Sequence, residues 1–197
     1  AESETKHRIG SAGYCLINQE LKINNPDQDG IGEIVAKGQN VMLGYYNDEE
    51  KTKEAFTKDG FFKTGDYGYI DKDGFLFITG RKKDIIVLKN GKNVYPQELE
   101  FLITKLDYVL ECIVFSRDKD KTDTVLKAKI VYDKDRIKQL YGEKSKEEYQ
   151  KDIWKDIKEI NKNLVTYKHI KEIEITDIPM EKTTTQKIKR YVEIEKE

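Results

Sequence analysis

Short runs in which apolar and polar residues alternate fill the first 80 positions of the chain. This period-two alternation, interrupted by Gly, Pro, Asn and Asp, predicts β-strands joined by turns. Asn47, with Glu50 three residues later, predicts the N-cap of a short helix over 48–56. We expect a small antiparallel β-barrel-like subdomain over residues 1–80, with strands at 14–17, 20–23, 32–37, 41–46, 61–64, 67–71 and 75–79.

After residue 84 the pattern becomes a mixture of strand and helix periods. Pro96 predicts the first turn of a helix that continues to residue 105. Apolar residues recur at helical spacing over 146–164, which predicts a long amphipathic helix, and 141–150 is interpreted as a connection between helices. We expect a compact α/β domain with a sheet covered by helices, and an α+β chain overall. Its strands are expected at 85–88, 109–116, 125–132 and 171–176, with a charged loop at 117–123 and a basic tail at the end.

Four charged residues separate the two halves: Arg81, Lys82, Lys83 and Asp84 stand between two hydrophobic segments. Such a polar break is typical of a hinge, which needs only a few residues to absorb a change of backbone angles. The sequence therefore predicts a boundary at 81–84, with one folded body over 1–80 and another over 85–197.

Composition narrows the class of protein. The chain has 197 residues, which fits one domain or two small ones, and 36 Lys and Arg balance 37 Asp and Glu. Without a basic excess we expect no nucleic-acid partner. Cys15 and Cys112 lie in apolar runs without a CxxC pair, so we expect buried free thiols and a reducing compartment.

No apolar run reaches the roughly 20 residues that span a bilayer, and the polar N-terminus lacks the apolar core of a signal peptide. We therefore expect a cytoplasmic protein, for which peripheral contact with a membrane stays open. The basic stretch 183–190 keeps a second interpretation open, in which the chain is a non-catalytic binding module that contacts RNA or the surface of an anionic membrane.

Several residues carry chemistry only when they are considered together. Asp66, in Thr64-Gly65-Asp66, is either a turn residue or a carboxylate that accepts from two neighbouring hydroxyls. Arg81 is either a surface charge or a planar donor to ribose or phosphate, and Gly91 is either a turn glycine or a point where the backbone approaches a ligand. His7 and His169 have no partner at suitable spacing, so we expect no metal site and no nucleophile, and there is no GxxxxGK[ST] phosphate loop.

Three stretches, in this order and spacing, resemble a known family. They are GEIVAKGQNVMLGYYND (32–48), DGFFKTGDYGYIDKDGFLFITGRKKDIIVLKNGKNVYPQELE (59–100) and IPMEKTTTQKIKR (178–190). They resemble late core motifs of the AMP-forming acyl-CoA synthetases of the adenylate-forming superfamily, and most of all the bacterial long-chain fatty acid–CoA ligases. The resemblance implies that the chain is a C-terminal piece of such a ligase, inactive by itself, and that the rest of the N-terminal domain is its partner.

The resemblance also implies a role for each matching residue. Asp66 matches the aspartate that binds both ribose hydroxyls, and Arg81 matches an arginine that contacts the ribose. Lys83 matches the hinge position, and Gly91 matches a glycine beside the tunnel for the pantetheine arm of CoA. Lys187 matches the catalytic lysine that bridges the carboxylate and the α-phosphate during adenylation.

ATP, Mg²⁺, CoA and a fatty acid are implied as substrates of the full-length enzyme, with no tightly bound cofactor on this piece. An enzyme that loads an acyl carrier protein is an alternative within the same superfamily. The chain departs from the family pattern at Gln186, where a glycine is usual before the lysine, and at Lys89-Asn90-Gly91, where a serine–glycine–glycine turn is common. Lys189 competes with Lys187 for the catalytic role, and the order of the motif favours Lys187.

Overall fold

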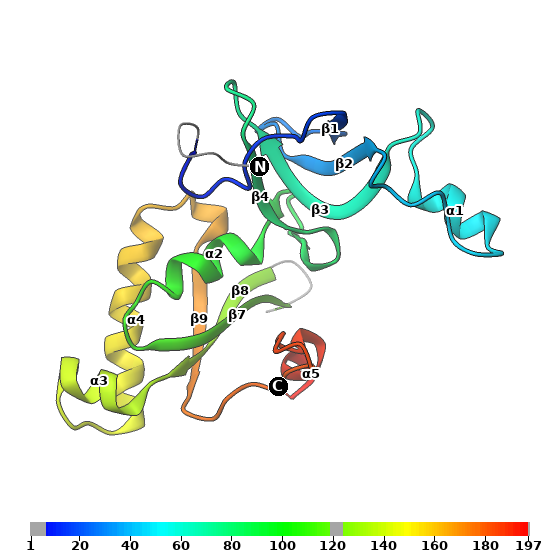
Figure 1. Cartoon of the computed structure of the whole chain (residues 1–197). Helices are drawn as coiled ribbons and strands as arrows, with labels where there is room; N and C mark the ends of the chain where they lie inside the picture. Colours follow the sequence, from blue (N-terminus) through cyan, green and yellow to red (C-terminus); the bar gives the residue numbers. More distant parts are fainter. Residues whose placement is uncertain (1–6, 119–123, 197) are drawn as a thin grey trace. The chain divides into compact units, whose positions relative to one another are not determined.

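The computed structural model describes residues 7–118 and 124–196, and the chain divides into two compact units (Figure 1). Unit 1 comprises Ala1–Ile85 and unit 2 comprises Ile86–Glu197. The division falls between Ile85 and Ile86, one residue beyond the segment 81–84. The first six residues of the polar N-terminus and residues 119–123 of the expected charged loop lie outside the described residues.

Unit 1 contains a four-stranded antiparallel sheet with strands in chain order. Its strands are β1 (Gln19–Asn24), β2 (Gly32–Gly38), β3 (Phe62–Ile70) and β4 (Leu76–Arg81). Among the described residues β1 and β4 do not pair, so the sheet is open and the expected barrel-like closure is not found. Alternation of apolar and polar residues along a strand indicates which face of the strand is buried. Closure of a sheet into a barrel depends instead on the number and tilt of its strands, and known barrels have more than four strands.

Two strand predictions in unit 1 merge into one strand. The segments 61–64 and 67–71 become the continuous β3, and Gly65 lies inside it at φ +75°. The segments 14–17 and 41–46 are not strands. Leu43 and Tyr46 are more than nine-tenths exposed, so the alternation at 41–46 does not mark a buried face.

The short helix α1 (Glu49–Ala55) is present, but its N-cap is Asp48 rather than Asn47. The carboxylate of Asp48 accepts from the amide of Lys51 at 2.9 Å, while Asn47 has φ +51° in the preceding turn. Asn and Asp both favour the N-cap position. A difference of one position along the chain decides which backbone amide the side chain can reach.

Unit 2 contains a three-stranded sheet in the order β7-β8-β9, formed by β7 (Val109–Asp118), β8 (Thr124–Tyr132) and β9 (Ile170–Thr176). Strands β7 and β8 are antiparallel, whereas β8 and β9 are parallel. A parallel connection needs a crossover, which is supplied by α3 (Lys134–Tyr141) and α4 (Lys146–Lys162). The remaining elements are η1 (Lys82–Asp84) in unit 1 and, in unit 2, the hairpin β5 (Ile86–Val87) and β6 (Asn93–Val94), α2 (Pro96–Ile103), η2 (Thr166–Lys168) and α5 (Arg190–Glu195).

The long helix α4 confirms the helical prediction for 146–164, and Ser145 with Glu148 forms a reciprocal capping box at its start. The sequence analysis did not predict the eight-residue helix α3, whose buried residue is Ile137. It also missed α5, which lies within the expected basic tail.

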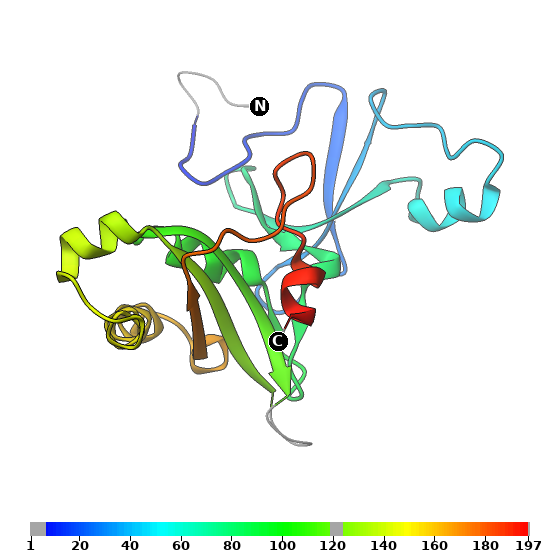
Figure 2. The ribbon, with the colours of Figure 1, turned by 90° about the horizontal axis from the view of Figure 1, so that it is seen from below.

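The sheet of unit 2 has two buried faces. Ala128 and Ile130 of β8 point into the main core, which α2 and α4 cover. Val131, one position out of phase, belongs to a second core with Ile113, Phe115, Met180 and the partly buried Ile188. Figures 1 and 2 both show α4 on one side of the three strands and α5 on the other. The C-terminal segment therefore covers the face of the sheet that the long helix leaves free.

Candidate functional site

Asp66 and Arg81 are the two predicted site residues that the structure brings together. They are directly paired in the register of β3 and β4, and Nε of Arg81 lies 3.0 Å from Oδ1 of Asp66. The side chain of Asp66 is 28% exposed and that of Arg81 is 64% exposed. A carboxylate that is bound on one oxygen and still reachable by solvent keeps acceptor sites for further hydroxyl donors.

Thr64 and Gly65 set the orientation of Asp66. The Thr64 hydroxyl donates to the carbonyl of Ile34 at 2.7 Å and accepts from the amide of Asp66 at 3.1 Å. Gly65 has φ +75°, a conformation that side chains disfavour, and a Cβ there would meet no atom within 4 Å. The glycine is therefore required by the backbone angle rather than by crowding.

The predicted hinge residue Lys83 lies in the middle of η1 and is exposed. Its neighbour Lys82 donates to Oε2 of Glu33 at 2.9 Å, and the carboxylate of Glu33 is only 6% exposed. This hydrogen bond raises the pKa of Lys82 against the opposing effect of burial. Lys82 thus fixes the start of η1 to β2, while Lys83 projects from it.

Gly91 lies in the turn of the β5–β6 hairpin. It has φ +76°, and its amide donates to the carbonyl of Leu88 at 2.8 Å. The side-chain oxygen of Asn90 accepts from the amide of Lys92 at 3.0 Å, which closes the turn. A Cβ at Gly91 would meet nothing within 4 Å, so the turn leaves one bare and accessible stretch of backbone.

Lys187 belongs to a second hairpin, which precedes α5. Lys182 and Ile188 form a bridge at its base, and the amide of Thr183 donates to the carbonyl of Lys187 at 2.8 Å. The Thr183 hydroxyl accepts from the amide of Lys187 at 3.2 Å. Gln186, the residue before the lysine, has φ +62°.

The two candidate lysines of this hairpin differ in their surroundings. Lys189 is ion-paired with Glu181, and this hydrogen bond together with the charge of Glu181 raises the pKa of Lys189. Lys187 is exposed, and its ammonium has no carboxylate partner among residues 7–118 and 124–196. Lys189 is therefore occupied by a carboxylate in this structure, whereas the ammonium of Lys187 remains open to solvent.

Buried contacts hold the N-terminal arm of this hairpin on the sheet. The carboxylate of Glu111 on β7 accepts from the amide of Met180 at 2.8 Å and pairs with Lys182. Glu193 on α5 accepts from the amide of Glu181 at 3.0 Å and lies 3.2 Å from the ammonium of Lys129 on β8. None of these sheet residues was singled out by sequence, because each partner is distant along the chain.

Other candidate sites are weak. No group of His, Cys, Asp or Glu within the described ranges could hold a metal ion. Cys112 is buried, and burial raises the pKa of its thiol, whereas Cys15 is only half-buried because it lies in a connection before β1. In the part of the chain that the structure describes, no helix is both long and apolar enough to cross a membrane.

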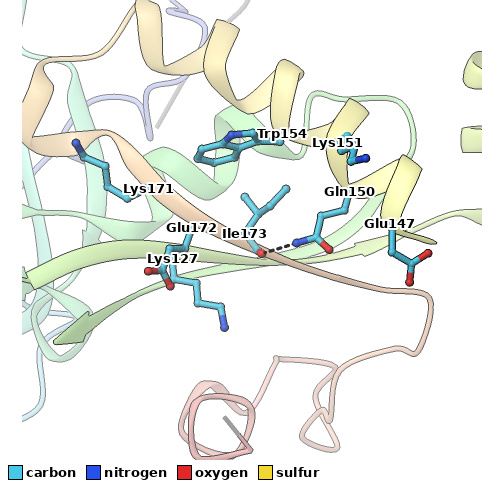
Figure 3. Close-up of a pocket in the computed structure, with 8 residues that line it drawn as sticks. All are labelled: Lys127, Glu147, Gln150, Lys151, Trp154, Lys171, Glu172 and Ile173. Atoms are coloured by element: carbon cyan, nitrogen blue, oxygen red, sulfur yellow. Dashed lines mark hydrogen bonds between the residues drawn. The ribbon is translucent and has the colours of Figure 1, made fainter. Parts of the chain in front are cut away.

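A groove of about 570 Å³ lies between α4 and β9, as Figure 3 shows. Trp154 stands over it, and the side-chain amide of Gln150 donates to the carbonyl of Ile173 at 3.3 Å. Lysine and glutamate side chains share its rim, so it presents no charge of one sign. None of the five predicted site residues lines this groove.

Comparisons with known proteins identify relatives of both units. The family described as "AMP-binding enzyme C-terminal domain" matches residues 83–195. A probable 4-coumarate–CoA ligase 2 of Dictyostelium discoideum is 48% identical over 118 residues, which are 57% of this chain and 21% of that protein. The long-chain-fatty-acid–CoA ligase ACSBG2 of Gallus gallus is 42% identical over 114 residues, 58% of this chain and 15% of that protein.

A solved structure has the same fold over almost the whole chain. It is the o-succinylbenzoate CoA synthetase of Bacillus subtilis in complex with its acyl-adenylate intermediate, with a TM-score of 0.72 at 31% identity. The match covers 93% of this chain and 35% of that one, and another structure of the same synthetase contains ATP and a magnesium ion. The chain thus spans about a third or less of the length of these relatives.

Proposed function

Because the chain belongs to the family of AMP-binding enzyme C-terminal domains, we propose that it is the C-terminal part of an ATP-dependent acid–thiol ligase. In the first half-reaction, a carboxylate oxygen of the acid attacks the α-phosphorus of ATP and pyrophosphate leaves, which gives an acyl-adenylate. In the second, the sulfur of CoA attacks the acyl carbon and AMP leaves. The 4-coumarate, fatty-acid and succinylbenzoate ligases among the relatives support this reaction class.

Asp66 and Arg81 are proposed to hold the ribose of the nucleotide. The carboxylate of Asp66 would accept from both hydroxyls of the ribose, and the Arg81 guanidinium would donate to the same sugar. Their side-by-side positions on β3 and β4, with Asp66 partly open to solvent, support this assignment. Gly91 would leave room for the arm of CoA, and Lys83 would be the pivot about which unit 2 reorients between the half-reactions.

Lys187 is proposed to supply the positive charge for adenylation. Negative charge builds up between the attacking carboxylate and the α-phosphate, and an ammonium on a long flexible stem can follow it. The observation that carries this proposal is that Lys187 is exposed and unpaired among the described residues, while its hairpin is fixed at the base. Magnesium would be held by the phosphates and by the remainder of the enzyme, since the described residues offer no cluster for it.

The finer proposal is that the acid is a fatty acid and the acceptor is CoA. The motif resemblance and the ACSBG2 relative support this choice. Incubating the full-length ligase with CoA and with an acyl carrier protein in separate reactions distinguishes the acceptors. Coumarate and succinylbenzoate, assayed beside a fatty acid, test the acid, and faster turnover of either would change the substrate proposed.

Replacing Lys187 tests the role of the hairpin. In the full-length ligase that contains this chain, Lys187→Ala is expected to slow adenylation by about 10²-fold or more, because one aimed charge is lost where charge develops. Thioester formation from supplied acyl-adenylate should continue. The two rates are measured by pyrophosphate exchange and by release of AMP in the presence of CoA.

Lys189→Ala is the matched control, because Lys189 is two residues away and already paired with Glu181. Its adenylation rate should stay close to that of the unmodified enzyme. Normal adenylation by Lys187→Ala, or a larger loss in Lys189→Ala, would remove Lys187 from the proposed role.

A further inference from the structure

The guanidinium of Arg190 joins three separate parts of unit 2. Its Nη1 lies 2.7 Å from Oε1 of Glu100 on α2, and its Nη2 donates to the carbonyl of Val114 on β7 at 2.7 Å. The same oxygen of Glu100 accepts from the amide of Val114 at 2.7 Å. Arg190, Glu100 and both backbone groups of Val114 thus form a closed set of contacts, which we call the edge clamp.

The edge clamp lies on the outer strand of the sheet. Within the described ranges strand β7 pairs with β8 alone, so its other edge carries backbone groups without a strand partner there. Such groups need other partners, and Glu100 and Arg190 provide an acceptor and a donor for Val114. The side chains of Arg190 and Glu100 are 22% and 14% exposed, so solvent weakens this pair less than it weakens a surface ion pair.

Arg190 is also three residues after Lys187, at the first position of α5. Between them, Ile188 packs against the second core, so the clamp fixes the chain directly where it leaves the hairpin. The other arm is held by Glu111, which accepts from the amide of Met180. The hairpin that carries Lys187 is thereby anchored on both sides, and only its turn is left unanchored.

We propose that Arg190 and Glu100 are positioning residues for Lys187 and set the place from which its ammonium is delivered. This inference rests on the proposed function of Lys187 in adenylation. A displacement of about 1 Å far from the chemistry can cost about 10²-fold in rate. The planar fork of arginine reaches two acceptors at fixed angles, whereas a lysine ammonium at the same place reaches them only as a point charge.

The test compares Arg190→Lys and Arg190→Ala in the full-length ligase. Arg190→Lys keeps the charge and removes the fork, and we expect adenylation to fall by about 10-fold, with Arg190→Ala approaching about 10²-fold. The loss should appear in kcat, with the KM for ATP nearly unchanged. The rate of thioester formation from supplied acyl-adenylate should stay within about twofold of that of the unmodified enzyme, since the position of Lys187 matters only in the first half-reaction.

Arg136→Lys is the matched control. Arg136 lies on α3 and forms an exposed ion pair with Asp107 at 3.6 Å, so the same chemical change is made in unit 2 away from the hairpin. Neither half-reaction should change in this variant. Circular dichroism during urea unfolding of every variant reports the fraction of folded protein, and so separates a displaced Lys187 from a loss of folded protein.

Equal losses in both half-reactions of Arg190→Lys, in proportion to lost folded protein, would overturn the inference, as would unchanged adenylation. Lys187→Ala is measured in parallel to distinguish the two proposals. Slow adenylation in Lys187→Ala beside normal adenylation in both Arg190 variants would overturn only the positioning role. Normal adenylation in Lys187→Ala would overturn the proposed function and, with it, the role of the clamp.

Discussion

Gln186 occupies the most demanding backbone position in the hairpin that carries Lys187. Its φ of +62° lies in the left-handed region, where a side chain is disfavoured and glycine is not. The glycine that is usual at this place in the resembling family would carry no such cost. The departure noted in the sequence therefore has a physical meaning, because it stores strain next to the proposed catalytic lysine.

Gln186→Gly should relieve this strain. We expect the free energy of unfolding of unit 2 to rise by about 0.5–1 kcal/mol, because the relieved strain exceeds the extra entropy of glycine in the unfolded chain. Urea titrations followed by Trp154 fluorescence measure the change. Gln186→Ala keeps a Cβ at the same angles and should match the unmodified chain, and equal gains in both variants would show that backbone strain is not the cause.

Glu193 is a buried carboxylate whose ionisation is tied to the folded state of unit 2. Burial opposes its negative charge, but hydrogen bonds from Lys196, the amide of Glu181 and Lys129 outweigh burial and lower the pKa of Glu193 to about 2. A carboxylate with a lowered pKa in the folded state stabilises that state above its ordinary pKa of 4.5. This stability is lost as the pH falls from about 4.5 towards 2.

Replacing Glu193 by Gln should therefore flatten the dependence of stability on pH. Between pH 5 and pH 2 the unmodified unit 2 should lose more unfolding free energy than Glu193→Gln, and at neutral pH the variant should be the less stable of the two. Urea midpoints from Trp154 fluorescence across this range provide the measurement. Glu195→Gln, an exposed change two residues away, is the control, and an identical slope in both variants would contradict the assignment.

At the scale of elements, long periodic patterns predicted structure well. Helix α4 and strands β2, β8 and β9 begin and end within about two residues of the ranges expected from sequence. The apolar positions of α4 repeat because one face of the helix is buried, whereas most of β8 is buried on both faces and its apolar residues form a nearly continuous run. The segment 41–46 alternates as clearly but leaves Leu43 and Tyr46 exposed, so alternation alone does not make a strand.

Elements held by distant partners were not predictable. Helix α5 has six residues, and Glu193 is its only buried residue. Its contacts run to Lys129 and, through Arg190, to Glu100, which lies 90 positions earlier. From sequence alone, a charged residue is expected to be exposed to solvent. The pattern therefore predicted a basic tail, whereas the structure has an anchored hairpin followed by a helix.

The candidate site also combines features that the sequence predicted with features that depend on distant parts of the chain. The resemblance named Asp66, Arg81, Lys83, Gly91 and Lys187, and the structure adds that Asp66 and Arg81 are paired neighbours in register. Their register could not be read from the sequence, since the pairing shifts by one residue between Tyr67 and Gly68, where Thr79 is an extra residue on β4. The roles of all five residues stay predictions until the half-reactions are measured.

At the scale of the whole molecule, the chain divides one residue after η1, the short helix in which Lys83 is exposed. If unit 2 reorients about Lys83, the backbone of Lys83 must adopt two different sets of φ and ψ angles during one catalytic cycle. Proline fixes φ near −65° and removes the amide hydrogen, so Lys83→Pro would retain only one of the two sets. Lys83→Ala removes the same side chain and leaves the backbone free.

In the proposed full-length ligase, Lys83→Pro is expected to lower overall turnover while sparing one half-reaction. Pyrophosphate exchange and CoA-dependent release of AMP, measured separately, show which half-reaction persists. Lys83→Ala should behave like the unmodified enzyme in both. Equal loss of both half-reactions in Lys83→Pro, or the same effect in Lys83→Ala, would argue against a pivot at this position.

The second core of unit 2 also has a consequence for synthesis of the chain. Ribosomes complete β7, β8 and β9 before they make the Met180–Glu193 segment that covers Ile113, Phe115 and Val131. At about 5–20 residues per second, this covering segment is completed about 1–4 s after the last strand, so the apolar face cannot be covered before then. The lysines and glutamates that flank it, such as Lys129 and Glu174, keep that nascent surface charged while the cover is still being translated.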